Sequence, residues 1–107
     1  MNAITIVIAK DFSPTPAGRY YPEDGDYPGQ RFREELLYPA LIKNTIVTVD
    51  LDGTSGYGSS FLEEAFGGLI RAGLQEKVLK MRMKVKSNRP SYETRIWDYI
   101  HKASVKA

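Results

Sequence analysis

Residues 45–68, which read TIVTVDLDGTSGYGSSFLEEAFGG, constrain the fold more than any other stretch of this chain. They begin with an apolar, β-branched run that is typical of a buried strand. A loop with three glycines follows, and residues 61–66 then have the pattern of a helix. A strand, a glycine-rich loop and a helix in this order predict an α/β domain. Any ligand or modification is expected at the turn, because free backbone N–H groups and the helix dipole favour a negative group there.

The flanking segments extend this pattern to a β-α-β-α-β-α order, with a mixed or mostly parallel sheet covered by helices. Residues 3–9 are almost entirely apolar and predict a central or well-covered strand. Residues 30–42 have apolar side chains at helical spacing, and Pro39 should kink this helix or end it just before the proline. The residues from 90 onward predict the last helix.

Residues 78–86 alternate between apolar and basic side chains. A period of two predicts a half-buried strand whose outer face carries Lys80, Arg82, Lys84 and Lys86. Such a basic face typically keeps an edge strand from pairing with other molecules, and a nucleic-acid surface is the alternative interpretation. A net charge of only +2 does not by itself indicate a nucleic-acid partner.

A chain of 107 residues predicts one domain spanning residues 1–107. Residues 11–29 hold four prolines and three glycines, which predict a long loop with at most one short edge strand at residues 19–21. Residues 103–107 are expected to form a frayed tail. The chain has no cysteine and no apolar run of membrane-spanning length. We therefore expect a soluble, cytoplasmic protein without disulfides, metal or cofactor.

Residues 50–54, DLDGT, resemble the first motif of haloacid-dehalogenase-type phosphatases. The resemblance implies Asp50 as the nucleophile and Asp52 as the acid and base, with Mg²⁺ at the paired carboxylates. However, the motif does not follow the first strand, no later acidic pair is present, and the chain is about half the length of such an enzyme. A Mg²⁺-dependent phosphatase or phosphate-binding enzyme is therefore the alternative function.

Ser59 and Ser60 stand at the start of the predicted second helix. One hydroxyl is expected to cap the helix, and Glu63, three residues after Ser60, would complete a capping box. The helix should bury its apolar side and expose Glu63 and Glu64. The same position makes either serine a candidate for phosphorylation, since a phosphate there is favoured by the helix dipole and repels an acidic partner surface.

Three segments together are similar to the STAS-like domain family of unknown function, a family of small bacterial proteins. They are GxxFRxxLLxPxL from Gly29, VxVDL from Val47 and SFLEEAFG from Ser60. The wider STAS class includes anti-sigma-factor antagonists, which are small α/β domains. Those domains bind a histidine-kinase-like ATPase and are switched by its phosphorylation of a serine.

The resemblance implies a single STAS-like domain with a regulatory, non-enzymatic role in signalling and a protein partner such as a histidine-kinase-like ATPase. In the STAS class the loop after the strand leads into Asp-Ser-Ser-Gly, and these positions fall on Gly58, Ser59, Ser60 and Phe61. Ser59 then matches the phosphorylated serine, and a shift of one residue would match Ser60. The chain departs from the class at Gly58 and Phe61. The expected partner-binding surface consists of Asp50, Asp52, Gly53, Thr54, Ser55, Gly56, Tyr57, Gly58, Phe61, Glu63 and Glu64.

Overall fold

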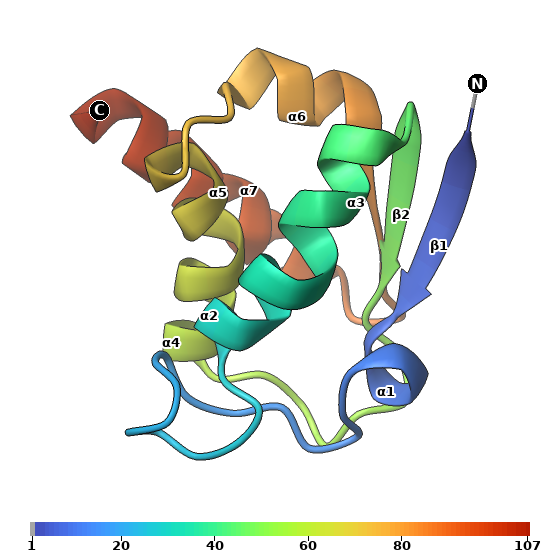
Figure 1. Ribbon diagram of the computed structural model, residues 1–107, viewed down its shortest axis with the longest axis vertical. Coiled ribbons are helices and arrows are strands. Elements are labelled where there is room, and N and C mark those ends of the chain that lie inside the picture. Colours follow the sequence, from blue (N-terminus) through green and yellow to red (C-terminus); the bar gives the residue numbers. More distant parts are fainter. Residues whose placement is uncertain (1) are drawn as a thin grey trace.

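Three parallel strands form the sheet of this protein, in the order β1 (Ala3–Val7), β2 (Ile46–Asp50) and β3 (Met83–Lys86) (Figure 1). The structure is a computed structural model, and it describes residues 2–107. Across the sheet, Ile6 lies opposite Val49, and Val49 lies opposite Val85. Parallel strands joined by helical connections are what the α/β pattern predicts, so the predicted fold class is confirmed.

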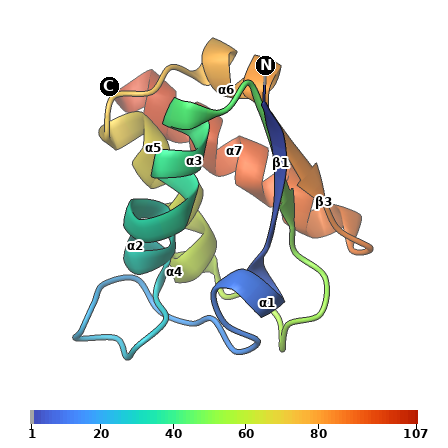
Figure 2. The same ribbon diagram turned by 45° about the vertical axis from the view of Figure 1, so that its right-hand side comes forward.

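Two long helical segments stand on one side of the sheet (Figures 1 and 2). The first runs through α2 (Gly29–Phe32), the π-helical turn η1 (Arg33–Leu37) and α3 (Tyr38–Lys43). The second runs through α4 (Ser59–Leu62), the π-helical turn η2 (Glu63–Gly67) and α5 (Gly68–Arg71). The remaining helices are α1 (Ile8–Asp11), α6 (Glu76–Arg82) and α7 (Pro90–Lys106). Helix α7 packs mainly on η2 and α5.

The core lies where the two helical segments meet over the sheet. Phe32 of the first segment and Phe61 and Phe66 of the second are fully buried, and the ring centroids of Phe32 and Phe61 are 6.0 Å apart. Val47 and Val49 supply the apolar surface of the sheet. Because aromatic side chains bury large apolar areas, this cluster is a main source of stability. It also holds the start of α4 beside the loop that follows β2.

The first helical segment passes through Pro39 without ending. The N–H of Tyr38 donates to the carbonyl of Arg33, five residues earlier, so the π turn lies directly before the proline. Proline has no N–H, and its ring crowds the preceding turn of a regular helix. The interruption predicted at this point therefore takes the form of a locally widened turn, after which the helix continues to Lys43.

The strand predicted over residues 78–86 is correct only in its second half, which is β3. The first half belongs to α6, in which Leu79 is buried and Met81 is 71% exposed, whereas alternation would bury both. Strand β3 is short because it pairs only with residues 47–50 of β2. The predicted basic face is therefore divided between α6, with Lys80 and Arg82, and β3, with Lys84 and Lys86.

The strand predicted over residues 3–9 is an edge strand and does not lie at the centre of the sheet (Figure 2). It ends at Val7, where the chain turns into α1. Ile6 is buried, but the side chains of residues 3–5 are exposed. The apolar character of this segment therefore does not reflect burial on both faces.

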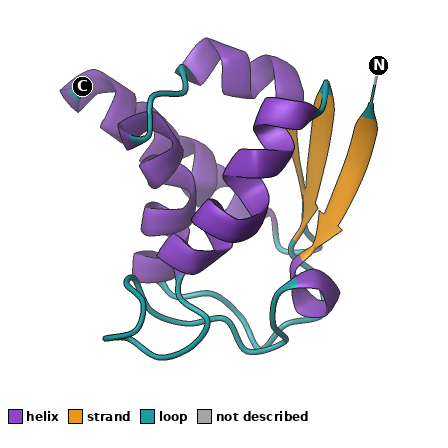
Figure 3. Ribbon diagram, in the orientation of Figure 1, coloured by secondary structure: helices purple, strands orange, loops and turns teal. Residues whose placement is uncertain are grey.

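The loop of residues 12–28 runs along the same end of the molecule as the loop after β2 (Figure 3). The edge strand expected at residues 19–21 does not form; the chain makes a turn there. The carboxylate of Asp24 accepts hydrogen bonds from the N–H groups of Arg19 at 3.1 Å and Tyr20 at 2.9 Å, which stabilises this turn.

The last helix is longer than the sequence predicts. Helix α7 continues to Lys106 and buries Ala103, although residues 103–107 are expected to be frayed.

Within residues 2–107, no helix combines the length and the apolar character that crossing a bilayer requires.

Candidate functional site

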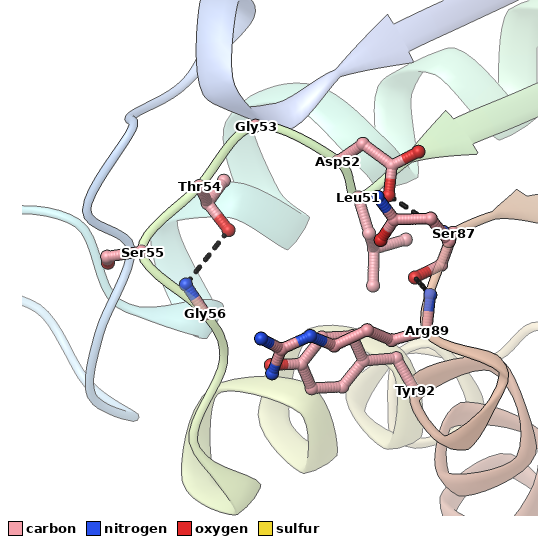
Figure 4. A pocket seen from close by; sticks show the side chains of 10 residues that line it. Leu51, Asp52, Gly53, Thr54, Ser55, Gly56, Ser87, Arg89 and Tyr92 are labelled. Carbon is pink, nitrogen blue, oxygen red and sulfur yellow. Dashed lines mark hydrogen bonds between the residues drawn. The ribbon is translucent and has the colours of Figure 1, made fainter.

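Two loops meet at the carboxyl ends of β2 and β3. Residues 51–58 connect β2 to α4, and residues 87–89 connect β3 to α7. A polar pocket of about 210 Å³ lies between them (Figure 4). It is lined by Leu51, Asp52, Gly53, Thr54, Ser55, Gly56, Ser87, Asn88, Arg89 and Tyr92. Open parallel sheets commonly place their ligand sites at this end of the strands, so the loop singled out from the sequence lies where such a site is expected.

Asp50 and Asp52 hold the two loops in shape. A carboxylate oxygen of Asp50 accepts the N–H of Asp52 at 3.0 Å, and one of Asp52 accepts the N–H of Asn88 at 2.8 Å. The second oxygen of Asp50 lies 3.6 Å from the ammonium group of Lys86. Within residues 2–107, no three carboxylate, histidine or cysteine side chains form a cluster suited to a metal. The fold brings the two aspartates together, and each carboxylate already accepts a backbone N–H of the protein.

Tyr57 anchors the 51–58 loop from inside the domain. Its side chain is 8% exposed, and its hydroxyl donates to the carbonyl of Leu51 at 2.7 Å. Its N–H donates to the hydroxyl of Tyr92 at 3.3 Å, and the two rings meet edge to face with centroids 5.2 Å apart. Burial raises the pKa of Tyr57 to about 12. Tyr57 therefore supports the loop from behind and is not part of its outer surface.

The second loop brings residues to the site that sequence reasoning did not identify. Arg89 is exposed, and its guanidinium lies 5.9 Å from the ring centroid of Tyr92. Figure 4 shows this guanidinium beside the ring, on the side of the loop that carries Gly56. The N–H of Arg89 donates to the hydroxyl of Ser87 at 3.0 Å, which shapes the turn. The only signal for it in the sequence is the polar segment between a strand and a helix. Because adjacent parallel strands end at the same edge of a sheet, this segment is expected beside the loop that follows β2.

Ser59 and Ser60 are the first two residues of α4, and both are exposed. The N-cap residue is Gly58, and no side chain caps the helix. The predicted serine cap, and the capping box with Glu63, are therefore wrong. Neither hydroxyl accepts an N–H of the first turn of α4 as a cap, and both residues are on the surface. The structure thus leaves both hydroxyls accessible.

Glu63 and Glu64 do not form the exposed face that the sequence predicts. Glu64 is 6% exposed, and its carboxylate accepts a hydrogen bond from Arg33 at 2.6 Å. Glu63 accepts hydrogen bonds from Arg71 and Arg19. The hydrogen bond from Arg71, and to a smaller extent the one from Arg19, holds the pKa of Glu63 below its usual value. Because Arg19 lies in the loop of residues 12–28, these ion pairs tie that loop to η2.

Part of the predicted partner-binding surface is therefore inside the fold. Tyr57, Phe61 and Glu64 are buried and cannot contact a partner in this conformation. Gly53, Ser55 and Gly58 are exposed together with the two serines, and Asp50, Asp52, Thr54 and Gly56 are half-buried. The surface that remains is a narrow strip formed by the 51–58 loop and the first residues of α4.

A protein-family model matches the part of the chain that carries this site. The family is described as STAS-like domain of unknown function, and the match covers residues 28–93, more than half of the chain. The matched region includes both long helical segments and both loops of the site. No curated protein and no solved structure matches the chain.

Proposed function

Because this chain belongs to the family of STAS-like domains of unknown function, we propose that it is a non-enzymatic regulatory domain that binds a protein partner. The proposed contact surface is the exposed strip of the 51–58 loop and the first turn of α4. The resemblance to the STAS class supports a histidine-kinase-like ATPase as the partner. In this proposal Ser59 or Ser60 is the phosphorylation switch.

The observation that carries the proposal is the exposure of Ser59 and Ser60 beside a loop that the fold supports from within. A kinase must reach the hydroxyl, and Gly58, Ser59 and Ser60 are all exposed, whereas the following Phe61 is buried. Neither hydroxyl caps the helix, so phosphorylation would break no capping hydrogen bond. The aspartate and tyrosine bonds keep the loop in one shape for a partner to recognise.

A phosphate on either serine would lie at the N-terminus of the helical segment of residues 59–71. The N–H of Leu62 donates to the carbonyl of Gly58 at 3.2 Å, which is the first hydrogen bond of this helix. The N–H groups of the helical residues before Leu62 have no acceptor within the helix. The helix dipole also favours an anion at this end. The modification would therefore leave the fold intact while adding nearly two negative charges to the surface. A partner with acidic groups facing this strip would be released.

The test is a pull-down of the tagged chain from extract of its own host with ATP present, read by mass spectrometry. We expect capture of a histidine-kinase-like ATPase and a phosphate on Ser59 or Ser60. The variants Ser59→Asp and Ser60→Asp should show weaker capture. Ser91→Asp is the matched control, because Ser91 is also exposed in the first turn of a helix. Absence of the ATPase with a folded bait would overturn the partner, and phosphate only at other residues would overturn the switch.

Magnesium chemistry at Asp50 and Asp52 predicts a different result. Each carboxylate accepts a backbone N–H with one of its oxygens, so a metal ion would have to share these carboxylates with the bonds that shape the two loops. Titration calorimetry with MgCl₂ distinguishes the two functions. Binding that disappears in Asp50→Asn would favour the phosphatase, and no heat of binding to the wild type would argue against the phosphatase.

A further inference from the structure

Within residues 2–107, strand β1 has no neighbouring strand on its outer side, so one row of its backbone groups pairs with no strand (Figure 2). The carbonyl of Asn2 accepts the N–H of Ile46 at 3.1 Å, so the even-numbered residues of β1 turn their backbone groups toward β2. Successive residues of a strand point these groups to opposite sides. The N–H and carbonyl groups of Ala3, Thr5 and Val7 therefore face outward.

Asp11 closes one end of this open edge. Its carboxylate accepts the outward-facing N–H of Val7 at 2.8 Å. The N–H groups that remain available along β1 are those of Ala3 and Thr5, whose side chains are exposed. The open edge thus offers the N–H and the carbonyl of Ala3 and those of Thr5, two positions further along the strand.

The two edges of the sheet differ in how they are protected against pairing. Strand β3 carries exposed lysines at Lys84 and Lys86, a common protection of edge strands. Strand β1 reads Ala-Ile-Thr-Ile-Val and has no charge, proline or bulge. Ile4 lies on the core-facing side of the sheet but is 39% exposed, because residues 2–107 cover it only in part at this edge. An unprotected apolar edge of this kind is suited to accept another strand.

We propose that this edge pairs with β1 of a second copy of the chain, antiparallel, to give a six-stranded sheet. Ala3 of one copy lies opposite Thr5 of the other, and the two residues exchange both N–H and carbonyl hydrogen bonds. The two-fold axis repeats this pair, so four hydrogen bonds form. The occupant is a second copy because the open row is self-complementary under a two-fold rotation and neither strand brings a charge into the contact.

The Asp11 bond selects this register. A register centred on Thr5 would place Ala3 opposite Val7 of the other copy, whose N–H is already bound to Asp11. The register centred on Ile4 uses only available groups. It also brings the two Ile4 side chains together as a non-hydrogen-bonded pair, about 4.5 Å apart at Cα. Their contact would continue the apolar row Ile4, Val47 and Met83 across the dimer.

Single-cysteine variants test the pairing and its register, since the natural chain has no cysteine. In Ile4→Cys the two cysteines would be about 4.5 Å apart at Cα, within the range that a disulfide spans. In Thr5→Cys they would be diagonal neighbours, about 7–8 Å apart, which is too far. Under mild oxidation, Ile4→Cys should form a covalent dimer at least ten times faster than Thr5→Cys. Equal rates, or a faster reaction of Thr5→Cys, would overturn the proposal.

Sedimentation equilibrium gives a second test that needs no cysteine. Thr5→Pro removes an outward N–H without breaking a bond to β2, a position where an edge strand accepts proline. The dissociation constant of the dimer should rise at least tenfold in Thr5→Pro and stay within a factor of two or so in Thr5→Val, which keeps the N–H. Circular dichroism confirms that each variant is folded. A wild type that stays monomeric up to about 1 mM would overturn the proposal and leave the edge to a strand of another protein.

Discussion

Arg33 donates one hydrogen bond to the carboxylate of Glu64 and one to its main-chain carbonyl, each at 2.6 Å. Arg33 belongs to η1 and Glu64 to η2, so this pair joins the two long helical segments. Gly68 makes room for it, because a Cβ at that position would overlap the guanidinium. The segments that resemble the STAS-like family thus meet in the interior. Arg33 and Glu64 hold the fold together and do not face a partner.

Replacing Glu64 by alanine should strongly destabilise the domain. Arg33, whose side chain is 12% exposed, would lose its carboxylate. Breaking one side of a buried ion pair typically costs about 3–5 kcal/mol. We expect a loss of about 3 kcal/mol in Glu64→Ala, at the low end of that range, because Arg33 keeps its bond to the main-chain carbonyl. Urea denaturation measures the free energy of unfolding.

The matched control for that variant is Glu34→Ala. Glu34 lies 3.5 Å from the same Arg33, but its side chain is 59% exposed. An exposed pair contributes at most about 1 kcal/mol, so this variant should remain close to the wild type. Equal losses in Glu34→Ala and Glu64→Ala would show that burial does not decide the strength of this contact.

Gly29→Ala should also destabilise the fold, by overpacking. An added Cβ would overlap the backbone carbonyl oxygen of Phe61 and crowd Ala65, so the two helical segments would have to separate. Overpacking of this kind typically costs about 1–3 kcal/mol. Thermal unfolding monitored by circular dichroism measures the effect. Gly58→Ser is the control, since a Cβ there meets nothing within 4 Å; a larger loss in the control would contradict the prediction.

Gly58→Asp should stabilise the domain slightly. Gly58 is the N-cap of α4, with φ −80° and ψ 162°, the extended conformation that capping residues adopt. An aspartate there can accept the free N–H groups of the first turn and complement the dipole. Because glycine is itself a fair N-cap, the gain should be only about 0.3–0.5 kcal/mol. Thermal unfolding should shift upward by about 2 °C, and a downward shift would contradict the assignment of the cap.

Tyr57 should give the domain a stability that decreases at alkaline pH. Burial raises the pKa of Tyr57 to about 12 in the folded state, against an ordinary value of about 10. The unfolded chain therefore loses this proton first as the pH rises. The contribution is fully present below about pH 10 and is lost as the pH approaches 12.

The variant Tyr57→Phe isolates that effect. At neutral pH it should be less stable by about 1 kcal/mol, because the carbonyl of Leu51 loses its buried donor. Between about pH 10 and pH 12, its free energy of unfolding should fall less steeply than that of the wild type. Urea denaturation at a series of pH values measures both slopes. Parallel slopes would mean that the phenol ionises at the same pH in the folded and unfolded chain.

Local pattern predicted the middle of the chain well, from β2 through the second helical segment, and was wrong where a distant contact decides the burial of a side chain. The run before Asp50 and the apolar spacing of residues 61–70 correspond to β2 and to the buried side of the second helical segment. The helical pattern also placed Glu64 outside, as expected for a charged residue. Arg33, 31 residues earlier in the chain, buries it by supplying a partner. A single sequence does not show such a pairing.

In the candidate site, too, local pattern predicted some residues correctly, and contacts between distant segments decided the others. The glycine loop and the two serines were identified from their position between a strand and a helix. The capping box was wrong because the helix begins at Ser59 with Gly58 as its N-cap, so neither serine is at the cap position. Glu63, which would have completed the box, instead accepts hydrogen bonds from Arg19 and Arg71. Arg89 and Tyr92 were missed because they reach the site only when β3 pairs with β2.

The sequence by itself determined the order of the three strands and the three main helical segments, and the place of the two serines at the start of the second segment, because local periodicity and glycine content act within a few residues of the chain. The tertiary structure alone decided that β1 is an edge strand, that α6 replaces half of a predicted strand, and that Arg33 and Glu64 are buried together. These features depend on strand pairing and on helices packing across long separations in the chain. Burial of a charge is favourable only when its partner is in place, and the fold is what brings the partner there.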